Sequence, residues 1–479
     1  MSRFKLFVEN LLVYGLGGVI SKLIPLLMLP IITRLMPDTF YFGLNDISVT
    51  IVSFGSAIAV MGMYDAMFRL FFDREDEEYR KIICSTTLTF TICLSVIVFF
   101  VLIIFGNFWS ELFFSDEKYR NLLFLSAMSI LVGATNSIVS APTRMKNQKK
   151  VFLATNILSP IISYAVSIPL LMRGLYVIAL PLASVVSAVT VETIFGILNK
   201  KWFSIKKIKI AYLKPLLIIA IPLFPNFLVY WIFQSCDKLM ISKILGMDYN
   251  GIYAIGGKIG QVSQLIYTAF AGGWQFFAFS TMKDSDQVEM TSHIFEYLAV
   301  ITFSAGMLMA ACSKAFFEIL FTGSYIQGYT VAPYLFLAPL LLMLFQVIVN
   351  QFIVIKKAWF NLMALFLGAA VNLVLNYVLI PVIGIEGAAI GTLCGYSVSI
   401  GITAAILTRR GLIKISKRFY VTVSLCIIYF ISWRFVFREN IYIGLLVAII
   451  FCIIYLLLFI KDLKKLKKEI NRYKNGNKI

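Results

Sequence analysis

Two lysines lie inside hydrophobic stretches of this chain, where an ionised side chain is costly. Lys22 is near the middle of the first stretch, and Lys258 is about two turns inside the eighth. A lysine at the centre of a membrane helix costs about 2.5–3.5 kcal/mol on insertion scales, so we expect Lys22 to face a wet interior or to pair with an acid on a neighbouring helix. Lys258 either does the same or extends its ammonium to the outer interface. A wet intramembrane cation is suited to binding an anion.

Carboxylates in similar positions offer the complementary chemistry. Asp46 lies in the second hydrophobic stretch, Glu192 lies inside the sixth, and Asp237 ends the seventh, directly before Lys238. Buried carboxylates of this kind bind a coupling proton or cation, and they equally well neutralise a nearby Lys or Arg. We therefore predict a role in ion coupling or charge balance for Asp46, Glu192 and Asp237.

Prolines interrupt two of the stretches, and one tryptophan stands apart from the others. Pro25 and Pro30 interrupt the first stretch, and Pro222 and Pro225 interrupt the seventh. Proline frees backbone carbonyls inside a helix, which suits a gate as well as a simple packing kink. Trp231 is the only tryptophan well inside a stretch, so it is the one aromatic candidate for substrate contact; the other five fall near stretch ends, where interfacial tryptophans are common.

Other chemistries have little support in the sequence. The single histidine, His293, falls in a polar loop, so no metal site and no histidine-based catalysis is expected. The chain has no Gly-Lys-Ser/Thr phosphate loop, and we expect neither ATP hydrolysis nor another cofactor. The longest loop on the predicted outer side, residues 106–120, is short for the sugar chemistry of a membrane polymerase or acyltransferase. We therefore predict a protein that is not an enzyme.

Composition identifies the environment of these residues. Hydrophobic residues make up 60% of the 479 and charged residues 14%, against roughly 45–50% and about 25% in soluble domains. The chain is therefore expected to be an all-α polytopic membrane protein. Its net charge of +19 belongs to loops rather than to a soluble basic face, so no nucleic-acid binding is expected.

About fourteen stretches are long enough to cross roughly 30 Å of hydrocarbon as helices. They cover approximately residues 11–33, 44–66, 82–105, 121–143, 151–172, 175–198, 214–236, 251–278, 294–313, 331–353, 360–381, 386–408, 419–437 and 441–460.

The loops between these spans differ in charge. If the N-terminus is cytoplasmic, the segments on that side hold 32 of the 43 Lys and Arg, the opposite side holds 9, and Lys22 and Lys258 lie within spans. Short loops rich in Lys and Arg stay in the cytoplasm. We therefore predict a multi-pass membrane protein with both termini in the cytoplasm; the resemblance given below implies the bacterial cytoplasmic (inner) membrane.

The second half of the chain weakly repeats the first. Three pairs of positions keep almost the same offset: Gly43 and Gly251 (208), Lys149 and Lys356 (207), and Gly174 and Gly384 (210). Because each repeat holds six spans, both halves enter the membrane from the same side, and the repeat is parallel. The predicted organisation is a six-helix lobe at 1–200, a basic cytoplasmic connector at 201–213, a second six-helix lobe at 214–410, two additional helices at 411–460, and a basic tail at 461–479. Repeats of this kind are typical of transporters that bind their substrate between the halves.

Three segments resemble a known family: the stretch from Tyr14 to Ile47, the stretch from Pro222 to Gly260, and GIEGAAIGT at 384–392. They are similar to Wzx-type polysaccharide repeat-unit flippases of the multidrug/oligosaccharidyl-lipid/polysaccharide exporter superfamily. The resemblance implies a V-shaped pair of six-helix lobes around a central cationic cavity. It also implies alternating access that moves an undecaprenyl-diphosphate-linked oligosaccharide from the inner to the outer leaflet.

A diphosphate needs desolvated cations, and the candidates on the first, seventh and eighth spans are Lys22, Arg34, Lys238 and Lys258. Expected partners are the lipid-linked oligosaccharide, membrane lipids, the machinery that polymerises and exports surface polysaccharide such as capsule or lipopolysaccharide, and a coupling proton or sodium ion. Two related functions stay open: a lipid-linked peptidoglycan precursor flippase and a cation-coupled multidrug exporter. A polysaccharide polymerase or acyltransferase is the alternative from another class.

Overall fold

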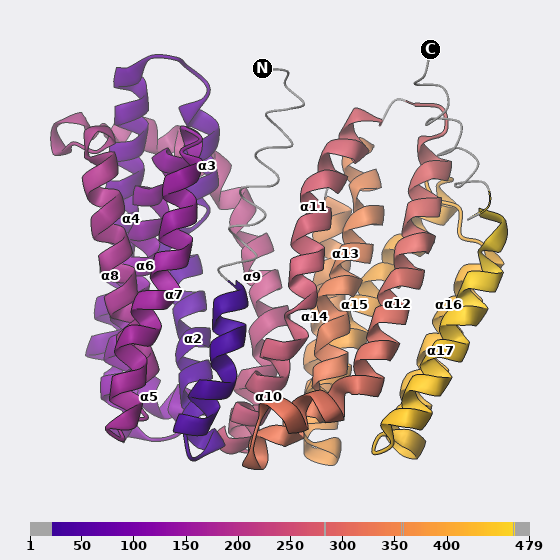
Figure 1. The fold of residues 1–479 in the computed structure, drawn as a ribbon. Coiled ribbons are helices and arrows are strands. Elements are labelled where there is room, and N and C mark those ends of the chain that lie inside the picture. The colour runs from indigo at the N-terminus through magenta and orange to yellow at the C-terminus, as the bar shows by residue number, and fades with distance from the viewer. Residues whose placement is uncertain (1–21, 282–283, 356, 358, 463, 465–479) are drawn as a thin grey trace. The chain divides into compact units, whose positions relative to one another are not determined.

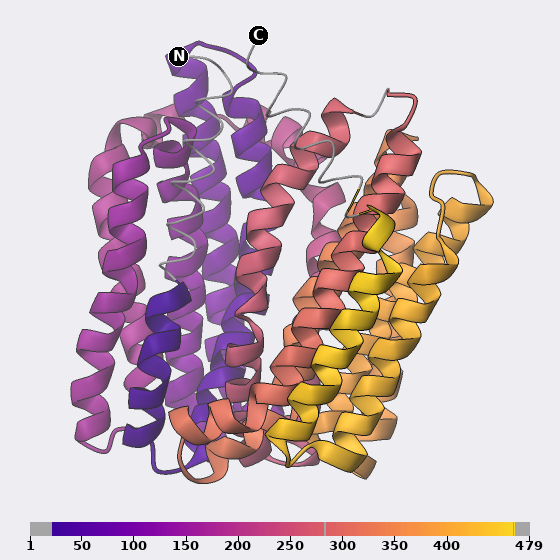
Figure 2. The same cartoon turned by 45° about the vertical axis from the view of Figure 1, so that its right-hand side comes forward.

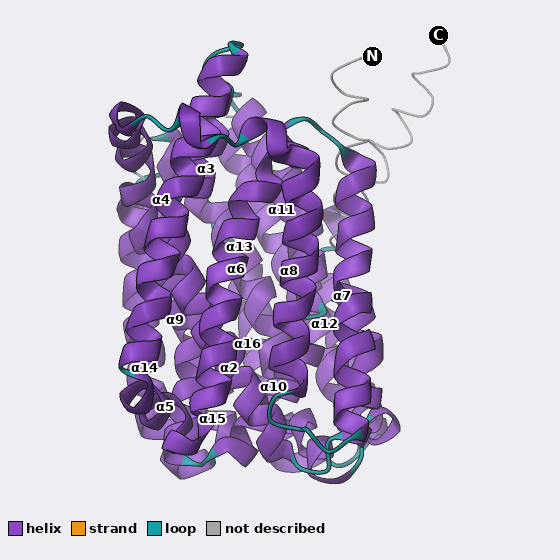
Figure 3. Ribbon diagram, turned by 90° about the vertical axis from the view of Figure 1, so that its left-hand side faces the viewer, coloured by secondary structure: helices purple, strands orange, loops and turns teal. Residues whose placement is uncertain are grey.

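The computed structural model describes residues 22–281, 284–355, 357, 359–462 and 464. This described part consists of helices joined by short loops and contains no β-strand (Figure 3). Twelve of its helices are long and apolar enough to cross a membrane. The prediction of an all-α polytopic membrane protein is therefore confirmed.

The two other predicted spans are present in a different form. Residues 22–35 form the described end of the first span, whose beginning at 11–21 lies outside the described residues. The eighth predicted span, 251–278, is divided between α10 (Met247–Gly260) and α11 (Ser263–Ser280). Of the predicted basic tail, only residues 461, 462 and 464 are described.

Contacts group the chain into two compact units, which are described separately. The first unit runs to Lys258 and adds residues 321–325 and 365–395; the second holds 259–320, 326–364 and the chain from Tyr396 onward. Besides α10, the helices of the first unit are α2 (Thr39–Val60), α3 (Met63–Phe71), α4 (Glu77–Ile104), α5 (Gly106–Phe114), α6 (Arg120–Met145), α7 (Lys149–Met172), α8 (Ala179–Asn199) and α9 (Leu213–Ile244). Both units share α14 (Trp359–Ile383) and α15 (Ile385–Arg409).

The second predicted span, 44–66, is broken in the structure. Asp38 caps the start of α2 by accepting a hydrogen bond from the Phe40 backbone N–H at 3.0 Å. The helix ends where Met61 and Gly62 both adopt positive φ, 45° and 75°. A Cβ at Gly62 would lie 2.7 Å from the Ala220 carbonyl oxygen, so the turn requires glycine both for its conformation and for the close approach of α9.

Small and polar side chains hold the long helices of the first unit together. Figure 1 shows α4, α6, α7 and α8 side by side. The hydroxyls of Ser48 and Ser126 join α2 to α6 at 2.7 Å. The Asn199 amide donates to the Val139 carbonyl at 2.9 Å, which fixes α8 against α6. Small residues and interhelical hydrogen bonds are the usual means of helix association in lipid.

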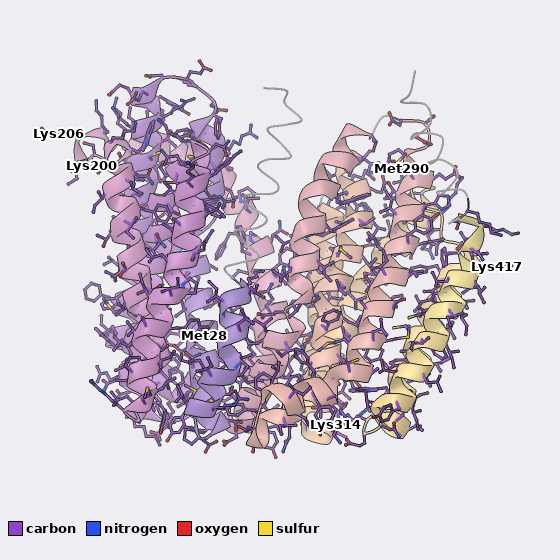
Figure 4. All side chains as sticks on the ribbon, viewed as in Figure 1. Met28, Lys200, Lys206, Met290, Lys314 and Lys417 are labelled. Atoms are coloured by element: carbon purple, nitrogen blue, oxygen red, sulfur yellow. The ribbon has the colours of Figure 1, made fainter. Side chains whose placement is uncertain are left out.

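The predicted connector, 201–213, packs against one end of α4. It consists of three short 3₁₀ turns. Its Trp202 is buried at 2% exposure, and the Lys146 ammonium lies 4.2 Å from the ring centroid. The Ser204 backbone N–H donates to the Ser85 hydroxyl at 3.0 Å. In Figure 4, Lys200 and Lys206 lie at the end of the unit that also carries α3, so the basic residues of this segment gather on one side of the helices.

The second unit is built on α12 (Gln287–Leu320). Its other helices are α11, α13 (Ala332–Val354), α16 (Lys417–Ser432), a π-helical turn at Trp433–Phe437, and α17 (Ile441–Leu458). Figure 2 shows α12 beside the yellow C-terminal helices. The buried Tyr429 hydroxyl on α16 lies 3.0 Å from the Met307 carbonyl of α12 and 3.1 Å from the Gly444 carbonyl of α17. One tyrosine thus joins the two additional C-terminal helices to α12.

Replacing Tyr429 by Phe should lower the free energy of unfolding of the purified protein by about 1 kcal/mol, because it removes a buried hydroxyl whose single proton is shared between the two carbonyls. The matched control is Tyr442→Phe at the start of α17, where the side chain is 83% exposed. Melting curves in detergent that show equal effects for the two variants would contradict this role of Tyr429.

Candidate functional site

Helices α2 and α9 meet along a seam that carries three of the predicted site residues, Asp46, Trp231 and Lys238. The Lys238 ammonium of α9 lies 2.9 Å from Oδ1 of Asp46 on α2. Two helical turns away on both helices, the Trp231 indole N–H donates to the Ser53 hydroxyl at 3.0 Å. The Trp231 ring also packs on Phe54, with 4.5 Å between ring centroids. Equal seven-residue spacings in opposite chain directions mean that the helices are antiparallel and share one contact face.

Lys238 and Asp46 form an ion pair that is nearly removed from solvent. The Asp46 side chain is 2% exposed and the Lys238 side chain 19%. Oδ2 of Asp46 has no hydrogen-bond partner in the described part of the chain. Separating a buried ion pair leaves an uncompensated charge, so each partner fixes the position of the other. Lys238 is therefore already neutralised by a protein carboxylate.

Asp237, the neighbour of Lys238, is held by different groups. It is 4% exposed, and its Oδ1 accepts the Lys238 backbone N–H at 2.9 Å. The hydroxyl of Tyr253, a fully buried residue of α10, donates to Oδ2. Both oxygens of this carboxylate are thus engaged by donors that carry no full positive charge.

Lys258 completes what we call the charge cluster: Asp46, Asp237, Lys238 and Lys258. Its side chain is exposed, and it forms no salt bridge in the described part of the chain. It lies close enough to feel the charges of Lys238 and Asp46. The cluster formally balances two carboxylates with two ammonium groups, and Lys258 is its exposed member.

A buried polar network borders the cluster and was missed by the sequence analysis. The Cys236 thiol donates to Oδ1 of Asn372 at 3.0 Å, and the Asn372 amide donates to the Thr392 hydroxyl at 3.0 Å. The Asn376 amide also reaches Asn372, at 3.3 Å. The signal that would have found it is the pair of asparagines at i and i+4 inside an otherwise apolar span, because both must face a polar neighbour.

The other predicted residues lie away from this cluster. Lys22 and Arg34 occupy the two ends of the helix at 22–35, both exposed and without an ion pair in the described residues. Arg34 lines a small pocket of about 150 Å³ together with Asp38 and Tyr325. Glu192 on α8 is half-buried, with the Thr135 side chain as its hydrogen-bonding neighbour.

The four prolines were expected to interrupt their helices, but both helices continue through them in the structure. Pro25 and Pro30 are within the helix at 22–35, and Pro222 and Pro225 lie on exposed positions of α9. In Figure 4, Met28 marks the helix that carries the first pair. A gating role for these prolines stays a prediction.

The starts of α2 and α10 cross at two glycines that the repeat relates. A Cβ at Gly43 would lie 2.0 Å from the Met247 carbonyl oxygen, and one at Gly251 would lie 2.0 Å from the Thr39 carbonyl oxygen. Each clashing oxygen belongs to the residue four positions before the other glycine, so the contact is reciprocal. The Asn250 amide donates to the Gly43 carbonyl at 3.1 Å. No other residue type allows the backbones to approach so closely.

Comparison with known proteins gives one family and one clear fold. The family described as "Polysaccharide biosynthesis protein" matches residues 31–328. An uncharacterized membrane protein of Methanocaldococcus jannaschii is 24% identical over 419 residues, which cover 81% of this chain and 80% of the relative.

Among solved structures, the lipid II flippase MurJ in an inward closed conformation matches with a TM-score of 0.70 and 14% identity, over 94% of this chain and 99% of that chain. An inward-facing multidrug resistance MATE family transporter of the MOP superfamily matches with a TM-score of 0.62 and 13% identity, over 82% and 97%. At these identities the likeness shows a shared fold.

Replacing Lys238 by Met should destabilise the protein by about 3 kcal/mol, since the buried Asp46 carboxylate loses its ion-pair partner. The double variant Asp46→Asn/Lys238→Met should recover part of this loss. Lys243→Met on the same helix is the control, because that exposed lysine donates only to Glu111 and Ser115. Strictly additive effects in a double-mutant cycle of denaturation free energies would mean that the pair contributes no coupling.

Asp248, in the first turn of α10, should make the crossing of α2 and α10 sensitive to pH. Its pKa is raised above 3.8, first by burial and then by the Asp38 carboxyl beside it. The protonated form is therefore favoured in the folded protein, and stability falls as the pH rises from that value through the raised pKa. Asp248→Asn should flatten this dependence and stabilise the protein near neutral pH. Melting temperatures across the acidic range test this, and a wild-type profile that rises with pH there would contradict it.

Proposed function

We propose that this protein flips undecaprenyl-diphosphate-linked oligosaccharides. The family match covers more than half of the chain, so the chain belongs to the polysaccharide biosynthesis protein family. In this proposal it carries repeat units for cell-surface polysaccharide from the cytoplasmic to the outer leaflet of the inner membrane. The multi-pass helical fold and its likeness to a flippase and to transporters support a transport function.

The observation that carries the proposal is the set of intramembrane cations without a protein counter-ion. Lys22 and Lys258 are exposed and form no ion pair in the described part of the chain. An unpaired ammonium inside the membrane is unfavourable, and a diphosphate supplies the missing anion together with strong hydrogen-bond acceptors. Lys238 acts differently in this proposal: its pair with Asp46 fixes α9 against α2 and supplies no free charge.

Transport of this kind breaks no covalent bond. The polyprenyl tail stays in lipid while the polar head crosses, and the two six-helix lobes alternate between inward and outward access. Asp237, Asp46 and Glu192 are the groups that a coupling proton or sodium ion would neutralise. Of these, Asp237 is the best placed, because its carboxylate is buried with neutral donors on both oxygens.

A lipid-linked peptidoglycan precursor flippase is the second candidate. The fold match to lipid II flippase MurJ, which extends over 94% of this chain, favours it. Its substrate also carries a lipid diphosphate, so the same cations would serve. The multidrug exporter is less favoured, because an unpaired Lys22 repels a cationic drug.

Reconstitution tests the proposal directly. Liposomes that contain the protein and fluorescent lipid-diphosphate sugars should show protein-dependent transfer, measured as the fraction of label quenched from the outside. Lys22→Ala and Lys258→Ala should each reduce the rate about tenfold, because each removes one charge-assisted contact of about 1.5 kcal/mol or more.

The matched control is Lys206→Ala, an exposed lysine of the connector (Figure 4). Equal rates for all four proteins would refute the role of the two cations. Movement of cationic drugs without movement of lipid-diphosphate sugars would assign the exporter function instead.

A further inference from the structure

A polar pocket lies inside the first unit, at a place that the charge cluster does not use. It has a volume of about 370 Å³, and it is formed by α6, α7, α8 and the helix at 22–35. Its polar lining residues are Asn136, Asn156, Ser159, Ser163, Tyr164, Ser184 and Ser187. A pocket of 300–1,000 Å³ is the usual size for a small ligand.

The pocket arises from matching stripes on two neighbouring helices. On α7, Asn156, Ser159 and Ser163 follow at i, i+3 and i+7. On α8, Ser184 and Ser187 are three residues apart, and Ser187 contacts Ser159 of α7. Residues three, four and seven apart share one face of a helix, so each helix turns a polar stripe away from lipid and toward the other.

Most of these polar groups lack a partner in the protein. Ser159 and Ser187 bond to each other, with their hydroxyl oxygens 3.0 Å apart. Oδ1 of Asn136 is buried and has no hydrogen-bond partner in the described part of the chain. Among the described residues, no side-chain hydrogen bond is formed by Asn156, Ser163, Tyr164 or Ser184 either. The buried Asn136 oxygen therefore needs a polar occupant, and the half-buried or exposed side chains around it are open to the same occupant.

The chemistry of the lining selects the kind of occupant. None of the described residues that line the pocket carries a charge, so they offer no counter-charge to a phosphate or a divalent cation. Hydroxyl and amide groups that both donate and accept are suited to a neutral polyhydroxylated molecule. Tyr164 adds an aromatic face against which the apolar side of a sugar ring can pack.

The pocket lies next to Lys22, a lysine that forms no ion pair among the described residues. Pro25 lines it, and Lys22 lies one turn earlier on the same face of the same helix, about 4.5 Å along the axis. In a lipid-linked oligosaccharide the first sugar is bonded directly to the diphosphate. A diphosphate at Lys22 therefore brings that sugar to the pocket without any further reach.

We propose that this pocket binds the first, diphosphate-proximal sugar of the transported lipid, which makes it the site of sugar recognition. The inference rests on the proposed function and deepens it. Lys22 binds the diphosphate, and the serine and asparagine side chains form hydrogen bonds with the neutral sugar.

Binding to purified protein in nanodiscs tests the proposal. The probes are undecaprenyl diphosphate alone and the same lipid bearing one glucose, galactose or N-acetylglucosamine. Wild-type protein should bind at least one sugar-bearing lipid about tenfold more tightly than the sugar-free lipid. Asn136→Leu and the double variant Ser163→Ala/Ser184→Ala should abolish this preference, while the affinity for sugar-free undecaprenyl diphosphate stays unchanged.

Ser167→Ala is the matched control. It removes a serine hydroxyl from the same helix, one turn beyond Ser163, but Ser167 is fully buried and does not line the pocket. The control should keep the wild-type preference. A wild-type protein that prefers no sugar-bearing lipid overturns the inference, and so does a preference that survives in the pocket variants. If undecaprenyl diphosphate itself does not bind, the proposed function fails together with the inference.

Cysteine labelling separates a sugar from an ion or from water. Ser184→Cys is nearly isosteric, and a small polar thiol reagent should modify it above the background of the native cysteines. The preferred sugar-bearing lipid should slow this labelling at least fivefold, and undecaprenyl diphosphate should not. Protection by sodium ions without lipid would assign the pocket to a coupling ion, and protection by neither would leave it a water-filled cavity; both results overturn the proposal.

Discussion

The structure of the first unit depends on one constraint: a charge or an unpaired polar group among apolar helices must find a partner. Asp46 and Lys238 meet it with each other and thereby fix α2 against α9. Asp237 meets it with the Tyr253 hydroxyl and a backbone N–H. These contacts anchor the start of α10 and, through the neighbouring asparagines, one face of α14. Three places do not meet this constraint in the described residues: Lys22, Lys258 and the polar pocket on α7 and α8.

Whether a charged residue has a partner in the structure distinguishes its role better than its position in the sequence does. From the sequence, Lys22, Lys238 and Lys258 are alike: each is a lysine in or at the end of an apolar stretch. In the structure Lys238 is paired with Asp46, whereas Lys22 and Lys258 form no salt bridge among the described residues. Only a cation without a counter-ion gains a full interaction when an anion arrives, because a paired one must first give up its partner. If the protein binds an anionic lipid as proposed, Lys22 and Lys258 are therefore the lysines that would contribute most to its binding.

The sequence predicts the class of structure well because hydrophobic length is a local property. A helix that must span the membrane needs about 20 apolar residues, and such stretches can be counted. The break at Met61 and Gly62 was not foreseen, since it follows from the approach of α9 at Ala220, far away in the chain. The pairing of Lys238 with Asp46 was not foreseen for the same reason: 192 residues separate the partners, and only packing chooses among the available acids. The serine and asparagine stripes were legible in the spacing, but their significance appears only once α7 and α8 face each other.

The glycine contact between α2 and α10 links the weak repeat to the unpaired charges. Gly43 and Gly251 are repeat-related, and each admits the backbone of the other helix to the same distance. A reciprocal contact of this kind is possible only if both positions are glycine, because a side chain at either one would clash with the other helix. No such reciprocity holds for the charges: Asp46 pairs with Lys238, and Lys22 stands beside a polar pocket whose stripes belong to α7 and α8. The repeat therefore includes a backbone contact between α2 and α10 but not the charged side chains around it. An asymmetric set of polar groups is what the proposed lipid substrate would need, because its charged diphosphate, its neutral hydroxylated sugar and its apolar tail each require a different kind of surface.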